Sequence, residues 1–169
     1  MFSRFKQHLQ DMQTIKALCE GAEEQARKAG QEQPGAEHYV LSALALEDGS
    51  ARRVFGRLGK DAEAYRAALA RQHSEALRKL GIDAGGAGEP LPVAGEASGL
   101  FDSQPSGQAL MQALPELAKQ SQAPLRGAHV LLAAAGMQHS LAARALRAMD
   151  VELEALVQAA DEELGKVHA

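Results

Sequence analysis

Apolar residues recur every three or four positions over much of this chain, and that spacing predicts amphipathic helices. The clearest helix runs from about Thr14 to Ala29, and the residues that share its apolar face are Ile15, Leu18, Ala22, Ala26 and Ala29. A shorter helix is expected before it, over residues 3 to about 12, with Ser3 as its N-cap. The apolar side of this shorter helix carries Phe2, Phe5, Leu9 and Met12.

Two further stretches are apolar almost all round, and each has a histidine near its start. The first covers about residues 36–47 and contains His38, and the second covers residues 127–137 and contains His129. Helices without a polar face are usually buried on most sides, so we expect both to lie in the core. No Cys/His cluster with zinc spacing accompanies the two histidines. We therefore expect each imidazole to bond to loop backbone as a structural group, rather than to bind metal or transfer protons.

The two histidine stretches belong to a tandem repeat, which decides the architecture. An offset of 91 residues (129 − 38) aligns the two halves of the chain without a gap. The aligned pairs are Ala22/Ala113, Lys28/Lys119, His38/His129, Leu41/Leu132, Ala43/Ala134, Ala51/Ala142, Arg53/Arg144, Leu58/Met149, Glu63/Glu154, Ala64/Ala155 and Ala68/Ala159. Each repeat is expected to contain a long helix, a loop, a buried helix, a short helix and a closing helix.

We expect a single domain over residues 1–169, with repeats at about 1–80 and 105–169. Residues 81–104 are rich in glycine and proline and lack a helical period, which indicates a linker or loose loop that could include a small hairpin. Pro115 must lie in the first turns of its helix or kink it. Three side chains are expected to cap helices: Ser50 caps 51–58, Asp61 caps 62–80 and Ser106 caps 107–121. Gly30 is expected to end the first long helix. The last two helices are expected over 139–148 and 151–165, with Asp150 in place of Gly59 in the turn between them.

Composition supports an all-α, pseudo-two-fold tandem repeat of a four-helix motif. Hydrophobic residues make up 46% of the chain but aromatics only 4%, so the core must be built from Ala and Leu, which are strong helix formers. The net charge of −4 has no basic patch, and we expect no nucleic-acid partner. No apolar run is long enough to span a bilayer. The lone Cys19 cannot form an internal disulfide, which favours a cytoplasmic location.

Several segments of the chain resemble the Clp N-terminal domain, or Clp repeat domain, which precedes the ATPase modules of the ClpA, ClpB and ClpC unfoldases. The segments that carry the resemblance are Met1–Phe5, Ala26–Gly30, Glu37–Leu44, Ala51–Gly59 and Leu146–Asp150. The second repeat departs from the family pattern, because Ala128 replaces the usual Glu and its core helix is reduced to Ala133–Ala135 and Gly136. The linker is also longer than is usual in the family.

The resemblance implies a non-catalytic module of the Clp unfoldase and protease system. Such a module would bind substrates, adaptors or the unfoldase and so regulate protein quality control, like the peptide-binding domain of the secretion-system unfoldase ClpV. No Gly-x-x-x-x-Gly-Lys-Ser/Thr phosphate loop occurs in the sequence, and Gly59-Lys60 lacks the upstream glycine. The chain is expected to be a stand-alone Clp-repeat protein or, less favoured, a fragment of a larger one. No cofactor is expected.

Glu37 is the sharpest candidate for binding a partner. In some family members the equivalent Glu helps to bind phosphoarginine on tagged substrates, and the resemblance transfers that role to Glu37 alone. The alternative is an acidic residue that merely suits the positive N-terminal end of a helix. Phe2, Arg4 and Phe5 are the other candidate partner-binding residues. Cys19 has no adjacent base and is expected to be unreactive, and His73 and His139 are expected to face solvent.

Two further hypotheses remain beside the binding module. The alternative is a protein that sequesters small molecules or cyclic peptides in a groove between the repeats. An enzyme is the least favoured class, because neither a Ser-His-Asp arrangement nor paired acids stand out. Arg52, Arg53 and Arg57 form a basic cluster, which is expected to be a solvated helix face rather than a site for an acidic partner.

Overall fold

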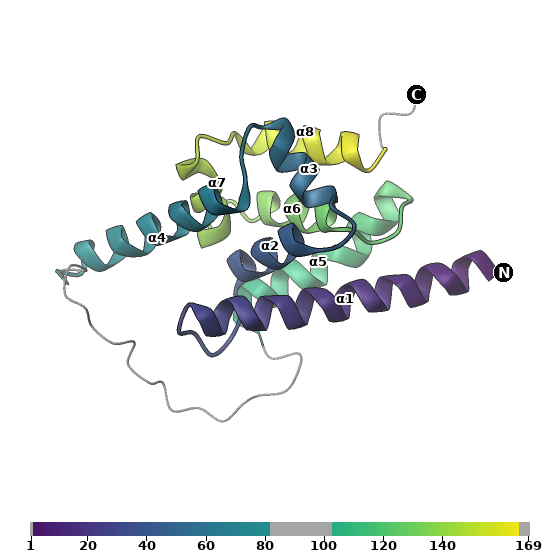
Figure 1. The fold of residues 1–169 in the computed structure, drawn as a ribbon, viewed down its shortest axis with the longest axis horizontal. Helices are drawn as coiled ribbons and strands as arrows, with labels where there is room; N and C mark the ends of the chain where they lie inside the picture. The colour runs from purple at the N-terminus through teal and green to yellow at the C-terminus, as the bar shows by residue number, and fades with distance from the viewer. Residues whose placement is uncertain (1, 82–102, 166–169) are drawn as a thin grey trace.

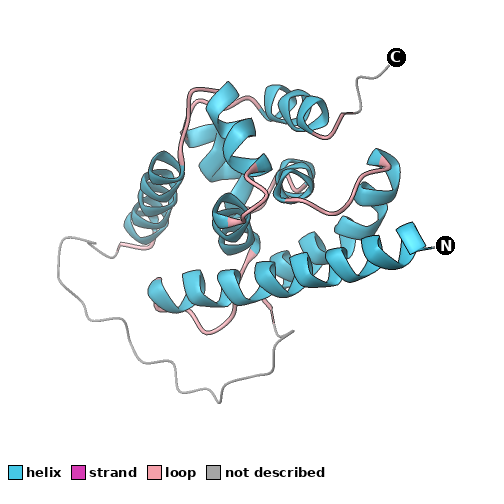
Figure 2. Ribbon diagram, turned by 45° about the vertical axis from the view of Figure 1, so that its right-hand side comes forward, coloured by secondary structure: helices cyan, strands magenta, loops and turns pink. Residues whose placement is uncertain are grey.

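A computed structural model describes residues 2–81 and 103–165. These residues form eight helices and no strand, as Figures 1 and 2 show. The helices are α1 Phe2–Lys28, α2 Ala36–Ala45, α3 Ser50–Arg57, α4 Ala62–Lys79, α5 Pro105–Ser121, α6 Gly127–Gly136, α7 Leu141–Ala148 and α8 Leu153–Glu163. The all-α prediction is therefore confirmed. Within the described ranges no helix is both long and apolar enough to cross a bilayer.

The helix boundaries reproduce the sequence repeat. Helices α2 and α6, and likewise α3 and α7, begin and end at positions separated by the same 91 residues, and α4 and α8 begin at that separation. The turn before the last helix is also repeated: Gly59 has φ 70° and Asp150 has φ 61°. Left-handed backbone of this kind favours glycine and tolerates Asp, which explains the replacement. The tandem four-helix motif is confirmed.

The first helix differs from its prediction. Residues 2–28 form one continuous helix instead of two helices that meet near residue 13. Thr14 lies within it, and its Oγ1 donates a hydrogen bond to the carbonyl oxygen of Gln10 at 3.0 Å. A threonine hydroxyl can bond in this way to the preceding turn, so the polar residues near the expected break do not end the helix. Gly30, with φ 74°, follows the helix as predicted.

Helices α2 and α6 lie at the centre of the molecule and the other helices surround them (Figure 1). Nine of the ten residues of α2, and nine of the ten of α6, are buried. Helix α1 can approach α2 closely because Gly21 has no side chain: a Cβ there would lie 2.3 Å from Ser42 Oγ. Ser42 Oγ in turn donates to the carbonyl oxygen of Leu18 at 2.9 Å. The core is thus built on close approach of small residues, as its Ala-rich composition implies.

Two predicted caps serve the other repeat instead of their own helices. Gly49 is the N-cap of α3, and Ser50 is its first residue. The Ser50 hydroxyl oxygen accepts a hydrogen bond from the Ala128 N–H of α6 at 2.9 Å. Ser106 is likewise inside α5, and its oxygen accepts from the Ala36 N–H of α2 at 3.1 Å. The predictions that Ser50 and Ser106 cap their own helices are therefore wrong, because the N–H groups that these side chains satisfy belong to the two buried helices.

Three other boundary predictions have clear outcomes. Asp61 caps α4 by accepting from the Ala64 N–H at 2.8 Å, as expected. The helix expected from residue 139 begins at Leu141 with Ser140 as its N-cap. Pro115 lies in the interior of α5, not in its first turns. The predicted small hairpin, and nearly all of the predicted linker, fall on residues 82–102, which the structure does not describe.

Candidate functional site

The two repeated histidines make the same hydrogen bond. His38 Nδ1 accepts from the Gly35 N–H at 2.9 Å, and His129 Nδ1 accepts from the Arg126 N–H at 3.0 Å. Each imidazole therefore satisfies one of the unpaired N–H groups that begin a helix. His129 Nε2 also lies 2.7 Å from Ser121 Oγ. The predicted bond to loop backbone is present in both repeats.

Burial disfavours the charged form of His38. Burial lowers its pKa below the ordinary value, and the carboxylate of Glu37, 3.6 Å from Nδ1, opposes that shift without cancelling it. A neutral ring is what the hydrogen bond from Gly35 requires, since Nδ1 must present its lone pair to the N–H. The ring thus holds the first turn of α2, and with it the position of Glu37.

Glu37 is buried in the first turn of α2, with only 5% of its surface exposed. Its carboxylate folds back over Gly35, where an added Cβ would lie 2.6 Å and 2.8 Å from the two oxygens. The glycine therefore leaves the space in which this carboxylate sits. A negative charge at this end of α2 also interacts favourably with the helix dipole, so part of the explanation for Glu37 is structural.

Glu37 also lines a pocket of about 360 Å³ on the surface of the first repeat. The pocket lies between the end of α1, the start of α2, the middle of α4 and the first residue of α7. Its lining residues are Gln25, Lys28, Ala29, Gln31, Glu37, His38, Leu41, Arg66, Leu69, Ala70, His73 and Leu141. The pocket combines an apolar floor with one carboxylate and several basic or amide groups, a composition typical of binding sites.

The basic residues of this pocket are held loosely. Lys28 Nζ pairs with Glu24 Oε1 at 3.0 Å, and Arg66 Nη1 pairs with Glu63 Oε1 at 2.7 Å. The side chains of Lys28 and Arg66 are 63% and 44% exposed. Exposed ion pairs of this kind contribute little to stability and exchange easily for other partners. The two cations can therefore contact an anionic group that enters beside Glu37.

The second repeat does not reproduce this site. Ala128 stands in place of Glu37 and Val157 in place of Arg66 at the same offset of 91 residues. The corresponding hollow, of about 490 Å³, is lined by apolar residues such as Leu132 and Val157 together with Glu154 and Asp161. Its basic groups are missing, so the charged pocket is a feature of the first repeat alone.

The other predicted partner-binding residues lie at the opposite end of α1. Phe2 and Phe5 are 85% and 62% exposed, and Arg4 is also exposed. Lys28, at the far end of the same helix, lines the Glu37 pocket. At 1.5 Å per residue the two regions are roughly 35 Å apart. The structure thus separates the predicted site residues into two surfaces and does not bring Glu37 together with Phe2, Arg4 and Phe5.

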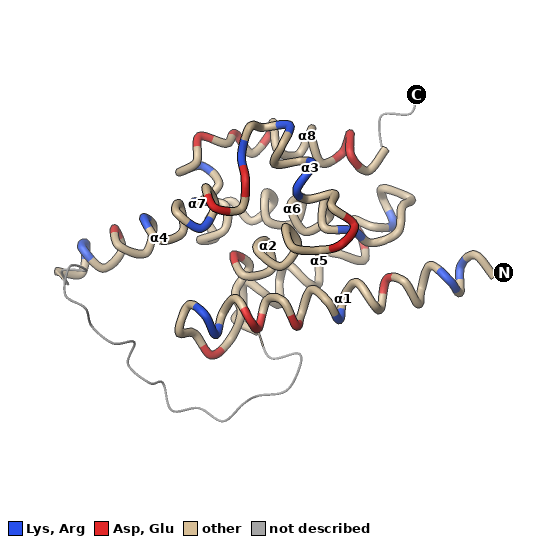
Figure 3. The backbone as a smooth tube through the Cα atoms, viewed as in Figure 1, with Lys and Arg blue, Asp and Glu red and all other residues tan. Residues whose placement is uncertain are grey.

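Cys19 and the basic cluster of α3 take structural positions. Cys19 is 2% exposed on the inner side of α1, and burial raises the pKa of its thiol, so the reactive thiolate is disfavoured. Arg53 and Arg57 form ion pairs with Glu162 and Glu163 of α8, where Figure 3 shows basic and acidic bands close together. They bind an acidic segment of their own chain, which the prediction of a solvated face did not foresee.

The sequence analysis missed Arg66 as part of the pocket. Arg66, Leu69, Ala70 and His73 follow the spacing of one helix face and all line it. His73 is exposed as predicted, yet it lies at the rim of this pocket. The periodicity was readable from the sequence, but nothing in the sequence indicated that this face of α4 turns toward Glu37. Among the described residues no group of three or more His, Cys, Asp or Glu is arranged to hold a metal ion.

Comparison with known proteins agrees with this architecture. The model of a protein family described as the Clp repeat (R) N-terminal domain matches residues 12–98. The match covers about half of the chain and includes the first repeat from the middle of α1 onward. It therefore contains Glu37, His38 and the other first-repeat residues of the charged pocket. A search of curated proteins finds no match to the chain.

Proposed function

This chain belongs to the Clp repeat (R) N-terminal domain family, a non-catalytic protein-binding module of Clp systems, and from that premise we propose that it binds client proteins through the Glu37 pocket. Domains of this family bind substrates or adaptors in general. The proposed partners here are a Clp ATPase, its adaptor or its substrates. Binding would regulate which proteins reach the unfoldase, and the chain itself would carry out no chemistry on them.

The observation that supports this proposal is a buried carboxylate at the edge of a pocket with a basic rim. Glu37 is buried in the space above Gly35, whereas the side chains of Lys28 and Arg66 are exposed and form only ion pairs at the surface. A carboxylate that is fixed in advance loses little entropy when it binds a cation. The arrangement therefore suits a ligand group that has a positive part facing Glu37 and a negative part facing the rim.

Phosphoarginine is the group with this distribution of charge. Its guanidinium can donate two parallel hydrogen bonds to a carboxylate, and its phosphoryl oxygens can accept from lysine and arginine. In the proposed complex Glu37 receives the guanidinium, and Lys28 and Arg66 contact the phosphoryl group. The apolar floor formed by Leu41 and Leu69 would cover the methylene groups of the ligand side chain.

Phe2, Arg4 and Phe5 form the second proposed contact surface. Exposed aromatic and arginine side chains are enriched in protein interfaces, which supports a binding role at this end of α1. This surface lies well away from the Glu37 pocket, so the two can engage different partners. We propose that the pocket recognises clients and that the surface at the start of α1 contacts a different partner.

The test is binding of a phosphoarginine peptide to the purified chain, measured by isothermal titration calorimetry beside the same peptide with unmodified arginine. We expect Glu37→Gln, which keeps the shape and removes the charge, to weaken binding at least tenfold, because a charge-assisted hydrogen bond is lost. Glu75→Gln removes the same charge from an exposed position of α4 outside the pocket and should change the affinity less than twofold.

Gly35→Ala provides a second and more specific variant. Gly35 has φ −97° and ψ 178°, a backbone conformation that alanine adopts freely, so the fold should tolerate the change. The new Cβ would nevertheless displace the Glu37 carboxylate. We expect binding to fall as in Glu37→Gln while the melting temperature stays within a few degrees. Unchanged peptide binding in both Gly35→Ala and Glu37→Gln would contradict the proposed site.

A pulldown from a cell lysate distinguishes the binding module from its alternative. The proposal expects a Clp unfoldase, an adaptor or modified clients, with clients lost in Glu37→Gln. A protein that sequesters small molecules or cyclic peptides would recover none of them. Such a protein would instead use the apolar pocket of about 250 Å³ between α1 and α5, whose lining includes Ile15, Met111 and Leu125.

A further inference from the structure

One face of α1 carries an apolar stripe that is largely exposed in the described structure. The N-terminal stripe consists of Phe2, Phe5, Leu9 and Met12, whose exposed fractions are 85%, 62%, 45% and 55%. Farther along the same face the residues become charged, beginning with Lys16. The apolar character is therefore confined to the first three turns, which is the pattern of a local interface and not of a core.

The position of the stripe explains why it is not buried by the chain's own helices. The residues of α1 that face the rest of the molecule are Leu18, Cys19, Ala22 and Ala26. At about 100° per residue, the N-terminal stripe lies roughly a third of a turn away from them. Figure 1 also shows the first turns of α1 extending past the neighbouring helices. The stripe is thus accessible to a second molecule, most of all at Phe2 and Phe5.

We infer that the N-terminal stripe pairs with the same stripe of a second copy of this chain, with the two helices antiparallel. This inference rests on the proposal that Phe2 and Phe5 contact a partner, and it names that partner. The steps of three, four and three residues are those of a coiled-coil seam. They are also symmetric about Gln7, so an antiparallel copy places Phe2 opposite the partner's Met12 and Phe5 opposite the partner's Leu9.

Charge favours the antiparallel direction. The first turns of α1 carry Arg4 and Lys6, and the next charged residue is Asp11, as the bands at the start of α1 in Figure 3 show. Parallel helices would place the basic ends of both copies together. Antiparallel helices keep Arg4 and Lys6 of each copy away from those of the partner and also oppose the two helix dipoles, whereas Asp11 Oδ1 already accepts from the Leu125 N–H of its own chain at 2.9 Å. The antiparallel direction therefore avoids the repulsion between like charges that the parallel direction would create.

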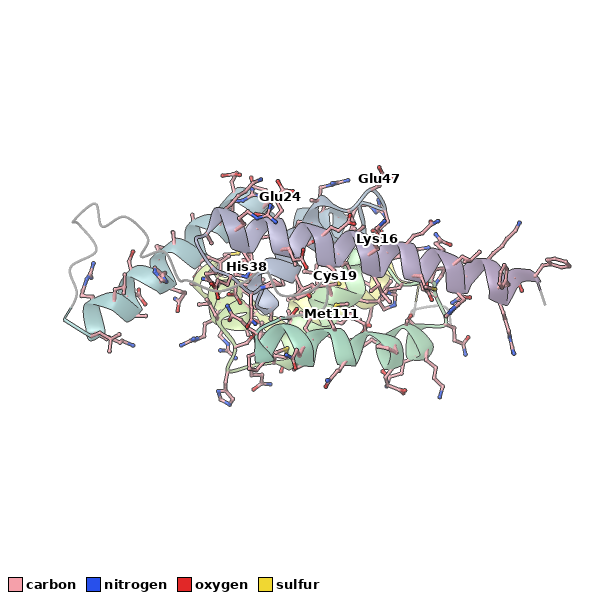
Figure 4. All side chains as sticks on the ribbon, turned by 90° about the horizontal axis from the view of Figure 1, so that it is seen from below. Lys16, Cys19, Glu24, His38, Glu47 and Met111 are labelled. Carbon is pink, nitrogen blue, oxygen red and sulfur yellow. The ribbon has the colours of Figure 1, made fainter. Side chains whose placement is uncertain are left out.

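The surrounding surface fits the same arrangement. Met12 borders the apolar pocket of about 250 Å³ between α1 and α5, together with Ile15 and Met111. Figure 4 places Met111 between these two helices. In the antiparallel pair the partner's Phe2 lies at Met12, next to this pocket. A two-fold pair would therefore place one phenyl ring at each of the two equivalent pockets, as an isologous interface requires.

The exposed area predicts a weak and reversible dimer. A fully buried Phe removes roughly 150–250 Å² from water, and the stripe side chains are only partly exposed in the free chain. Two stripes together would bury on the order of 1,000 Å², which is at the lower limit for a specific interface. We expect a dissociation constant on the order of 10–100 μM, not an obligate dimer.

The test is sedimentation equilibrium of the whole chain between about 5 and 500 μM. Phe5→Glu should weaken dimerisation at least tenfold, because it places a charge in the seam. Gln7→Glu adds one negative charge on the opposite side of the same helix and should leave the dimer intact. Both variants should keep the wild-type melting temperature and phosphoarginine-peptide affinity, so a failure of the dimer remains distinct from a failure of the Glu37 pocket.

The direction of the pair is tested by disulfide trapping in a Cys19→Ala background. A Phe5→Cys chain should crosslink to a Leu9→Cys chain, and neither should crosslink efficiently to itself. Preferential self-crosslinking of Phe5→Cys would overturn the antiparallel arrangement. A wild-type chain that stays monomeric at 500 μM, or a Phe5→Glu chain that still dimerises, would overturn the inference. Monomeric chain that binds phosphatidylglycerol vesicles through Phe2 and Phe5 would identify a lipid surface as the occupant instead.

Discussion

At the scale of single residues, the two histidines show what a sequence pattern can establish. Their repetition at one offset, each at the start of an apolar helix, was enough to predict a backbone hydrogen bond, and the structure shows that bond twice. The setting of Glu37 could not be predicted in the same way. The space above Gly35 and the approach of Arg66 depend on how α4 packs against α2, which no local pattern contains.

His38 predicts a pH dependence of stability. Its folded-state pKa is lowered by burial, so the unfolded chain binds a proton more readily than the folded chain. The stabilising difference is fully present above the unfolded value of about 6.5 and is lost as the pH falls from there toward the folded pKa. We expect urea unfolding to show a decline below about pH 6.5 that is smaller in His38→Gln. Equal slopes in both chains would contradict this prediction.

At the scale of helices, the starts of α6, α7 and α8 repeat those of α2, α3 and α4 at the offset of 91 residues, although starts at 139 and 151 were predicted for α7 and α8, which begin at Leu141 and Leu153. The repeat did not identify where α1 is continuous. The polar residues between Met12 and Ile15 resemble a boundary, yet a helix interior accepts them when they face solvent. The caps at Ser50 and Ser106 show the same limit: local sequence identifies a hydrogen-bonding side chain, and tertiary packing decides which helix uses it.

Pro115 gives the prediction at this scale. It lies in the interior of α5 and is exposed to solvent. It therefore removes one backbone hydrogen bond and destabilises the helix, and it adds no packing to the core. We expect Pro115→Ala to raise the free energy of unfolding by about 1–3 kcal/mol, measured by urea denaturation. Gln112→Ala, also exposed on α5, is the control and should change stability by less than about 0.5 kcal/mol. A destabilised Pro115→Ala chain would mean that packing requires the proline.

At the scale of the whole molecule, the two repeats depend on one another for hydrogen bonds as well as for apolar burial. The first N–H groups of α6 are satisfied by Asp48 and Ser50 of the first repeat, and that of Ala36 in α2 is satisfied by Ser106 of the second. Each central helix therefore relies on the other half for at least one of its N-terminal donors. Unfolding is therefore expected to be a single transition that includes both repeats.

Ser50→Ala tests this dependence. The Ser50 side chain is fully buried, and its loss leaves the Ala128 N–H of the other repeat without an acceptor, at a cost of about 1–3 kcal/mol. Circular dichroism reports all helices, whereas fluorescence comes from Tyr39 and Tyr65, both in the first repeat. Both signals should shift together to lower urea concentration in Ser50→Ala and stay in place in Ser74→Ala, a partly exposed site on α4. If fluorescence kept its wild-type midpoint while circular dichroism shifted, the repeats would unfold separately and the shared capping would not couple them.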